Sequence, residues 1–331
     1  MDHKIEKILE QATQVYIENF PAEAWFERCI FVSWYCSLGN CTFCYRSTQK
    51  DKIVDPKMAK RKMASIVAEA MLCKGLGWEL DFITGGFGVY STEEMVEIAK
   101  NVSQAMGKKV WFNYGVFGDS ALEKFKPYVE GICSSIETVN PKVQKEVVPG
   151  KNIQAYIEML KKAKGFKKSL AIVIGIGETR DDIPILHKLI EETRLDRLTI
   201  FALHPIAGTP FKKGPDPEYY AEWIAKTRIA FPKLEIIAGV PSNLLDKAGL
   251  ALRAGANAIT KFPAIKLFGT EKAEFVEKQI EATGRKFRGT LTKLPEIDWQ
   301  AEIKKLNVPQ ELKKEVDWKL KQYLKRMKNQ Y

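Results

Sequence analysis

Three cysteines lie within nine residues of one another, at positions 36, 41 and 44, in the spacing C-x₄-C-x₂-C. Three thiolates on one loop can hold three irons of a 4Fe–4S cluster, which leaves the fourth iron open to another ligand. Gly39 and Asn40 lie between the first two cysteines and permit the tight turns that such a loop needs. The trio Cys36, Cys41 and Cys44 therefore predicts an iron–sulfur centre.

Two other interpretations of the trio stay open at this point. Structural zinc usually takes four protein ligands, and the chain has no second C-x₂-C pair and no H-x₃₋₅-H pair to complete such a set. The cysteines could also be free and buried. The remaining three, Cys29, Cys73 and Cys133, are scattered, whereas a disulfide scaffold would be shorter and richer in cysteine.

The elements that must position this loop alternate between strand and helix patterns. Eight short runs rich in Val, Ile, Phe and Tyr have the composition of buried parallel strands. They are Arg28–Trp34, Leu80–Thr84, Lys109–Tyr114, Gly131–Ile136, Ser169–Ile174, Arg197–Leu203, Leu234–Ala238 and Ala256–Thr260. Helical patterns lie between them, at Pro56–Leu76, Thr92–Met106, Asp119–Tyr128, Asn152–Gly165, Asp181–Thr193, Pro217–Phe231 and Leu244–Ala254. This alternation predicts an α/β protein with a (β/α)₈ barrel of the TIM type, and an open doubly wound sheet is the alternative.

We expect extensions on both sides of the barrel. Residues 1–25 are predicted to form an N-terminal helical extension, residues 26–268 the barrel, and residues 269–331 a C-terminal helical extension. Pro309 suits the first turn of a last amphipathic helix, whose apolar stripe we expect to pack on the barrel. A docking helix for a partner protein is the alternative.

Composition limits the partners. Lys plus Arg (52) exceeds Asp plus Glu (41), for a net charge of +11, which indicates a solvated basic surface or an anionic ligand or partner. We find no nucleic-acid-binding module, so a basic RNA-binding protein with a structural metal is only an alternative. No apolar run reaches the roughly 18 residues of a membrane span. The charged first ten residues lack the apolar stretch of a signal peptide, so we expect a cytoplasmic protein that binds neither membrane nor nucleic acid.

In a barrel the chemistry lies where strands end at their C-terminal side, and unusual segments occur there. The second strand ends in Thr84-Gly85-Gly86, and the fourth in Glu137-Thr-Val-Asn-Pro141. The fifth reads Ala171-Ile-Val-Ile-Gly175-Ile-Gly-Glu178, and the sixth leads into Leu203-His-Pro-Ile-Ala-Gly-Thr-Pro210. The eighth contains Ala254-Gly-Ala-Asn257.

Together these segments resemble the radical S-adenosylmethionine (SAM) enzymes, in the branch of biotin synthase and the hydrogenase maturases. The resemblance covers residues 25–265. That family has a Gly-Gly turn beside the SAM amino group, an E-T-x-N-P segment whose acid contacts SAM, and a G-x-I-x-G-x-x-E strand beside adenine. The present chain departs from the usual C-x₃-C-x₂-C by one residue, and Phe87 stands where a Glu usually follows the two glycines.

The resemblance implies a 4Fe–4S cluster on Cys36, Cys41 and Cys44, with SAM chelated by the open iron and cleaved to a 5′-deoxyadenosyl radical. The barrel would shield that chemistry. The implied cofactor contacts are Phe43, Thr84, Gly85, Gly86, Asn113, Glu137, Lys151, Val173, Gly175, Leu203 and His204. Lys151 is predicted to pair with the SAM carboxylate. We expect a side chain at Gly86 to block SAM while the cluster persists, because the cysteine loop follows a different strand.

Partners follow from the same resemblance. They are a small-molecule substrate inside the barrel, an electron donor such as ferredoxin or flavodoxin, and further cofactor-assembly proteins. The candidate substrate-facing side chains are Trp34, Trp111, Asn113, Tyr114, His204 and Lys261.

Within the branch, the long cysteine spacing most resembles the radical SAM maturase of iron-only hydrogenase, a family implicated in building the iron-guanylylpyridinol cofactor. The alternatives are another carbon-skeleton enzyme, similar to methylornithine synthase or a diiron-hydrogenase maturase, and a non-catalytic iron–sulfur carrier. Biotin synthesis is disfavoured because it needs more cysteines inside the barrel.

Overall fold

Eight parallel strands form a closed barrel in the computed structural model, which describes residues 3–328. The hydrogen-bonded order runs from β2 through β8 to β1, and pairing of β1 with β2 closes the ring. The strands are β1 (Glu23–Phe31), β2 (Glu79–Thr84), β3 (Val110–Asn113), β4 (Val129–Glu137), β5 (Lys167–Ile174), β6 (Arg197–Ala202), β7 (Glu235–Gly239) and β8 (Ala258–Thr260). The predicted (β/α)₈ barrel is confirmed.

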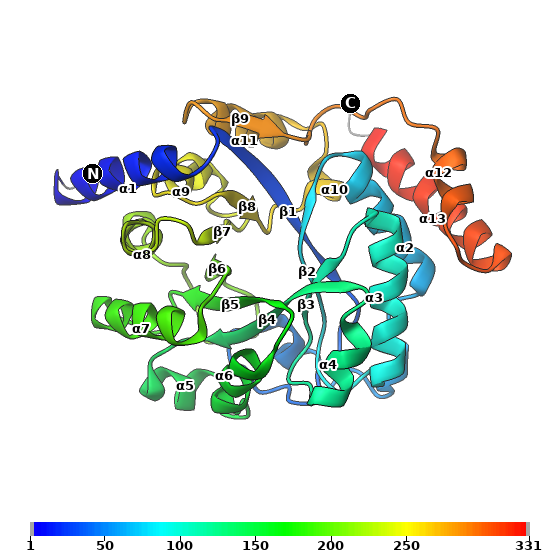
Figure 1. Ribbon diagram of the computed structural model, residues 1–331, viewed down its shortest axis with the longest axis horizontal. Coiled ribbons are helices and arrows are strands. Elements are labelled where there is room, and N and C mark those ends of the chain that lie inside the picture. The colour runs from blue at the N-terminus through cyan, green and yellow to red at the C-terminus, as the bar shows by residue number, and fades with distance from the viewer. Residues whose placement is uncertain (1–2, 329–331) are drawn as a thin grey trace.

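Helices surround this barrel on its outer side (Figure 1). They are α2 (Met63–Gly75), α3 (Thr92–Met106), α4 (Asp119–Phe125), α5 (Pro141–Val147), α6 (Ile153–Lys162), α7 (Ile183–Thr193), α8 (Pro217–Ala230) and α9 (Ala248–Arg253). Local chemistry fixes their ends: Ser91 accepts from the Glu94 amide while the Glu94 carboxylate accepts from the Ser91 amide, which is a capping box at the start of α3.

The first strand was predicted too late in the chain. It begins at Glu23 and ends at Phe31, not at residues 28–34. Its early part carries Glu23 and Glu27, and charged residues hide a strand from a search for apolar runs. Glu27 is nevertheless completely buried, because it points into the barrel.

The helix predicted over Pro56–Leu76 is two separate pieces. A short 3₁₀ helix spans Pro56–Ala59 and α2 begins only at Met63. The chain between them is extended, and Lys60 forms an antiparallel bridge with Ser33. This break returns the chain to the end of β1 after the cysteine loop.

Helix α1 and the last helix, α13, pack on different parts of the barrel wall (Figure 1). Helix α1 (His3–Asn19) lies against α8 and α9. The C-terminal segment comprises α10 (Ala264–Leu267), α11 (Glu271–Glu281), β9 (Lys286–Arg288), α12 (Trp299–Lys305) and α13 (Gln310–Lys328). The predicted packing of the last helix is confirmed: α13 lies on α2 and buries Val316 and Leu320, whereas Trp318 is exposed. The short strand β9, which pairs with the start of β1, was not predicted.

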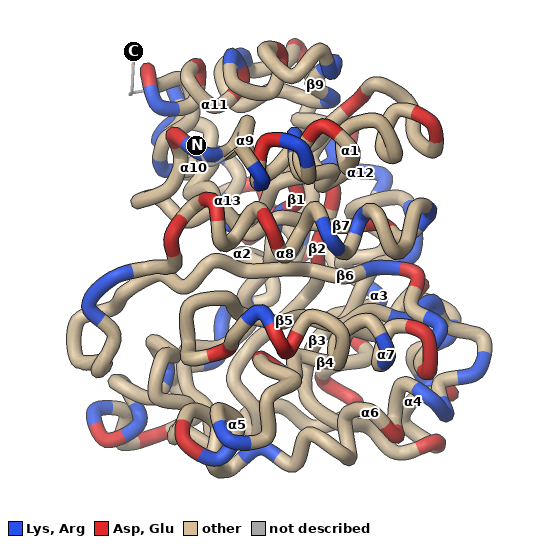
Figure 2. The backbone as a smooth tube through the Cα atoms, turned by 90° about the vertical axis from the view of Figure 1, so that its left-hand side faces the viewer, with Lys and Arg blue, Asp and Glu red and all other residues tan. Residues whose placement is uncertain are grey.

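No helix within residues 3–328 combines the length and the apolar character that crossing a bilayer requires. On the face shown in Figure 2, Lys and Arg are interspersed with Asp and Glu along the chain. The cytoplasmic location stays a prediction.

Candidate functional site

The cysteine loop is held in place mainly by backbone contacts. It follows β1 and ends in a short 3₁₀ helix (Tyr45–Thr48). The Cys44 amide donates to the Cys41 carbonyl over 3.0 Å, and the Thr42 amide donates to the Val147 carbonyl at the end of α5 over 2.9 Å. The extra residue of the long spacing is absorbed in a turn where Gly39 has φ +52°, a conformation that favours glycine.

Two neighbouring turns press directly on this loop. A Cβ on Gly86, in the turn after β2, would lie 1.6 Å from the Tyr35 carbonyl oxygen and 2.8 Å from the Cys36 Cα. A Cβ on Gly150, before α6, would lie 2.4 Å from the Asn40 side chain. Close approach to the cysteine loop therefore requires glycine at position 86, where the contact is with backbone atoms, whereas at position 150 only the Asn40 side chain would have to move.

The turn after β2 also bonds to the loop. The Phe87 amide donates to the Cys36 sulfur over 3.4 Å, and the Ser37 amide donates to the Phe87 carbonyl over 2.9 Å. The Phe87 side chain lies over Gly115 and is 42% exposed. The residue that departs from the family pattern thus joins the turn to the loop through its backbone.

The donor set fits a cluster of several irons. All three cysteines are partly exposed free thiols on one loop. Burial raises the pKa of the Cys41 thiol to about 12, so this sulfur needs a metal to become a thiolate. Within residues 3–328 no three His, Cys, Asp or Glu side chains are grouped around a single-ion position. In a cluster each thiolate binds a different iron, so the three sulfurs need not converge on one point.

Glu137 and Lys151 form a buried ion pair next to the cysteines. The Lys151 ammonium lies 2.6 Å from the Glu137 carboxylate and 2.8 Å from the Ser135 carbonyl oxygen. Burial lowers the pKa of Lys151, but the Glu137 charge outweighs it, and the pKa lies above its ordinary value. Lys151 is therefore a fixed positive charge, and it also lowers the pKa of Cys41 electrostatically.

The backbone presents Glu137 in an unusual conformation. Its φ is +66°, in the left-handed region that non-glycine residues rarely adopt. The pairing of β4 with β5 shifts register between Ser135 and Glu137. A carboxylate held in this way at the end of a barrel strand is a candidate ligand-binding group.

The ends of β5 and β6 provide an apolar wall and a tight turn. Val173 and Leu203 are both buried. Gly175 has φ +104°, and the Glu178 carboxylate accepts from the amides of Gly175 and Ile176 over 2.7 and 3.0 Å. The final Glu of this motif is thus a turn-capping group.

The other predicted contacts lie in different surroundings. Asn113 is buried and donates to the Ser135 hydroxyl over 2.7 Å, which places it beside the Lys151 pair. The Phe43 side chain is partly buried and packs against the core. Thr84 and Gly85 are also partly buried. His204 is exposed and its Nδ1 lies 2.7 Å from Asn243 of the loop after β7. Among residues 3–328, no hydrogen bond or ion pair joins His204 to the cysteine loop.

Two resembling segments have structural roles. Asn140 caps α5, accepting from the amides of Lys142 and Val143. Asn257 lies before β8, at the N-terminal face of the barrel, where its side chain accepts from Arg228 and from the Ile236 amide. Polar groups at that face of a barrel contribute to stability rather than catalysis.

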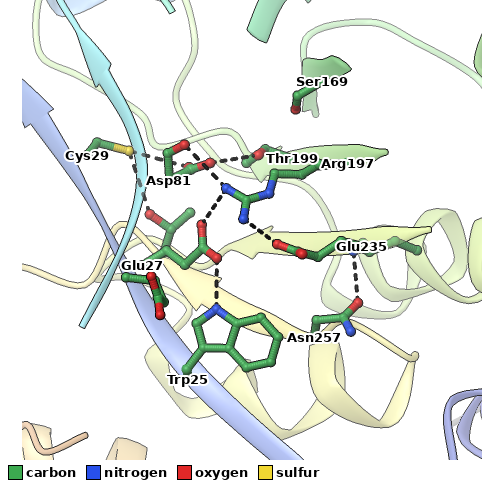
Figure 3. A network of polar contacts seen from close by, with 12 residues as sticks. Trp25, Glu27, Cys29, Asp81, Ser169, Arg197, Thr199, Glu235 and Asn257 are labelled. Atoms are coloured by element: carbon green, nitrogen blue, oxygen red, sulfur yellow. Dashed lines mark hydrogen bonds and ion pairs between the residues drawn. The ribbon is translucent and has the colours of Figure 1, made fainter. Parts of the chain in front are cut away.

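The sequence analysis missed a polar network inside the barrel, which Figure 3 shows. Arg197 lies 3.2 Å from Glu27, pairs with Glu235, and stacks on Trp111. Burial raises the pKa of Glu27 to about 8, with Arg197 opposing and Glu235 and Asp81 adding to the shift. The available signal was a charged residue within or beside each apolar run, at Glu27, Asp81, Arg197 and Glu235.

Next to Arg197, the Asp81 carboxylate accepts from the Thr199 hydroxyl over 2.9 Å and from the Cys29 thiol over 3.5 Å. Burial raises the pKa of Asp81 to about 6. Lys261, with φ +74°, follows β8 and places its ammonium 4.6 Å from the centre of the Phe201 ring. Trp34, predicted to face substrate, is 47% exposed and stacks on Phe31, whose ring centre lies 5.2 Å from the Lys261 ammonium.

Comparisons with known proteins agree with this arrangement. Residues 31–190 match the model of the Radical SAM superfamily, and residues 199–284 match the Biotin and Thiamin Synthesis associated domain. An uncharacterized protein of Methanocaldococcus jannaschii is 36% identical over 98% of this chain and 96% of its own length. The 3-methylornithine synthase of Methanosarcina barkeri is 22% identical over 77% of this chain and 74% of its own.

Solved structures show the same fold. Methylornithine synthase superposes with a TM-score of 0.72 at 20% identity, over 91% of this chain and 93% of that one. A maturase of the [FeFe]-hydrogenase superposes with a TM-score of 0.66 at 12% identity, over 99% and 84%.

Proposed function

The chain belongs to the radical SAM superfamily, and we propose that it acts in the biosynthesis of the iron-guanylylpyridinol cofactor of iron-only hydrogenase. It is an enzyme of that superfamily, and its cofactors are a 4Fe–4S cluster and SAM. A non-catalytic iron–sulfur carrier is therefore not retained.

When bound, the cluster and SAM supply a 5′-deoxyadenosyl radical that removes a hydrogen atom from the substrate. The protein's own part in the proposal is to position and shield. Cys36, Cys41 and Cys44 hold three irons, and Glu137 and Lys151 offer one acceptor and one cation to the amino and carboxylate groups of SAM. Val173 and Leu203 keep the adenine side dry.

The observation that carries the narrower proposal is the cysteine loop itself. Its spacing departs from the usual one in the direction found in the resembling maturase, and the positive φ of Gly39 absorbs the extra residue. Gly86 lets the turn after β2 approach the backbone of this loop closely.

A second candidate is a carbon-skeleton rearrangement similar to that of methylornithine synthase. The match to 3-methylornithine synthase over 77% of the chain favours it. Both candidates need a small molecule inside the barrel, next to Asp81 and Lys261.

One experiment separates them. Anaerobically reconstituted protein is reduced and given SAM together with either a labelled precursor of the pyridinol ring or a mixture of the free proteinogenic amino acids. We expect 5′-deoxyadenosine formation to rise at least tenfold with the precursor and its label to be altered. Stimulation by the amino acids with formation of methylornithine would contradict the cofactor-biosynthesis proposal, and the Cys36→Ala variant gives the background.

The electron donor is proposed to be an acidic protein of the ferredoxin or flavodoxin class. The segment 51–62, which follows the cysteine loop, exposes Val54 (99%) and Met58 (83%). Lys52, Lys57 and Lys62 are exposed on the same segment, together with the carboxylates of Asp51 and Asp55. An apolar centre on a segment where ammonium groups outnumber carboxylates suits a partner with a negative surface.

The docking proposal is tested with Lys52→Glu/Lys57→Glu. Reduction of the cluster by an acidic flavodoxin should slow at least fivefold, whereas reduction by dithionite should not change. Lys188→Glu/Lys278→Glu removes equally exposed charges from α7 and α11 and is the control. Equal slowing in both double variants would contradict docking at segment 51–62.

A further inference from the structure

A cavity of about 400 Å³ lies outside the barrel, between β1, α2 and the C-terminal helices α10 and α13. These four elements lie side by side in Figure 1. The volume is within the usual range for small-molecule sites, about 300–1,000 Å³. The cavity is separate from the cofactor site, because its lining includes none of the predicted cofactor contacts.

The lining is strongly basic. Arg28, Arg61, Lys266 and Arg326 contribute four cations, and Glu69 contributes the one carboxylate. Glu69 is buried between Arg28 at 2.6 Å and Arg61 at 2.5 Å, so both of its oxygens are already used. Although burial raises the pKa of Glu69, the two guanidinium groups lower it below its ordinary value, so the carboxylate stays charged.

Three positive charges therefore remain over the single carboxylate. Among residues 3–328, neither Lys266 nor Arg326 has an ion-pair partner, and both are exposed at the cavity. Like charges brought together in this way repel one another, and an anion between them would relieve that repulsion. A single carboxylate would leave two of the three charges unbalanced, whereas a diphosphate balances them.

The opposite wall is flat and apolar. The rings of Phe31 and Trp34 stack at 6.0 Å with an interplanar angle of 28°, and Trp34 is 47% exposed. Ile265 adds an aliphatic side chain. Tyr323 is fixed by the Arg61 guanidinium and the Ser65 hydroxyl, each 2.8 Å from its hydroxyl oxygen. The site thus combines a cationic end with a rigid aromatic end.

We propose that this cavity between β1, α2, α10 and α13 binds a nucleoside diphosphate or a closely similar phosphorylated aromatic molecule. The phosphates lie between Lys266 and Arg326, and the flat ring lies on Trp34. The ligand also touches the strand that leads to the cysteines, since Arg61 donates to the Phe31 carbonyl over 3.1 Å, five residues before Cys36.

The test is calorimetric titration of the intact chain with ADP, pyrophosphate, citrate and adenosine, each in the presence of saturating SAM. SAM occupies the barrel, so binding that persists belongs to a second site. We expect ADP to bind, pyrophosphate to bind more weakly, and adenosine not to bind. Citrate binding as tight as that of ADP would overturn the phosphate assignment, and loss of ADP binding with SAM would overturn the separate site.

Matched variants locate the site. Lys266→Ala/Arg326→Ala should weaken ADP binding at least tenfold, whereas Lys272→Ala/Lys325→Ala, which removes exposed charges from neighbouring positions outside the cavity, should not. Trp34→Ala should weaken ADP binding and leave pyrophosphate unchanged. Equal effects of the two double variants, or no effect of Trp34→Ala on ADP, would overturn the proposal.

Discussion

Buried charged groups have different partners at the two ends of the barrel. At the N-terminal face, Arg197 meets Glu27 and Glu235 from three different strands, and its positive charge is matched inside the fold. At the C-terminal face, Lys151 and Glu137 pair with each other next to the three thiols, and the Lys151 charge lowers the pKa of Cys41.

This difference separates stability from function. At the N-terminal face Arg197 of β6 ties β1 and β7 together through its two carboxylate partners, although the buried Arg197 Nε has no hydrogen-bond partner among residues 3–328. At the C-terminal face a buried charged pair lies beside the Cys41 thiol, whose pKa burial raises, and such buried polar groups are costly unless something else binds there. Changes at the N-terminal face should therefore affect unfolding first, and changes at the C-terminal face should affect cofactors first.

The largest expected effect comes from the cysteines. Cys36→Ala removes one iron ligand and should reduce bound iron from about four to below one per chain and abolish SAM cleavage. Cys73→Ala is the control, because Cys73 is buried within α2 and should keep the iron. Iron and sulfide analysis with electron paramagnetic resonance measures both. If Cys36→Ala kept its iron and Cys73→Ala lost it, the assignment of the iron to Cys36, Cys41 and Cys44 would be wrong.

A nearly equal effect is expected at Gly86, where the structure corrects the sequence analysis. Gly86→Val was expected to spare the cluster, but its Cβ would overlap the Tyr35 carbonyl at 1.6 Å. The valine must displace the cysteine loop, so iron and SAM cleavage should be lost together while the barrel stays folded. Gly118→Val is the control, since nothing lies within 4 Å of a Cβ there. Full iron content in Gly86→Val would show that the loop can move aside.

That correction shows where sequence reasoning stops. The apolar runs predicted eight strands and the barrel, because period and composition are local properties. The cysteine spacing predicted the trio for the same reason. Contact between Gly86 and Cys36 is not local: the two residues are 50 positions apart and meet only because β1 and β2 pair in a parallel register.

Charged residues inside strands also limited what could be predicted from the sequence. Glu27 and Arg197 looked like breaks or ends of apolar runs, and only the barrel's closure shows that they face each other across 170 residues. Asn140 and Asn257 belong to two of the segments that carry the family resemblance, and the structure gives them helix-capping and strand-supporting roles that the resemblance did not predict.

A smaller effect is expected for the carboxylate beside the cysteines. Glu137→Gln should weaken SAM binding about tenfold or more while iron stays bound, because a hydrogen bond to a charged group contributes about 1.5–3 kcal/mol. Glu130→Gln, on the same strand but at the surface in a pair with Lys167, is the control. Equilibrium binding of SAM to the unreduced protein is the measurement, and unchanged affinity would make Glu137 a purely structural partner of Lys151.

The smallest expected effect concerns pH and the N-terminal face. Burial raises the pKa of Glu27 from 4.5 to about 8, so the folded protein holds this proton more tightly than the unfolded chain does. The resulting stabilisation is complete below about pH 4.5 and is lost as pH rises through 8. Thermal unfolding of the wild type should therefore shift to lower temperature between pH 5 and pH 8.5, and Glu27→Gln, which carries no titrating proton, should reduce this slope of unfolding temperature against pH.

The control is Glu123→Gln, exposed on α4, which should keep the wild-type slope. Because the Glu27 carboxylate pairs with Arg197 of β6 and Arg197 pairs with Glu235 of β7, none of them on the cysteine loop, iron content should be the same in all three proteins. A slope that is unchanged in Glu27→Gln would mean that Arg197 keeps Glu27 ionised in the folded state, and the N-terminal face would then be a permanently charged network.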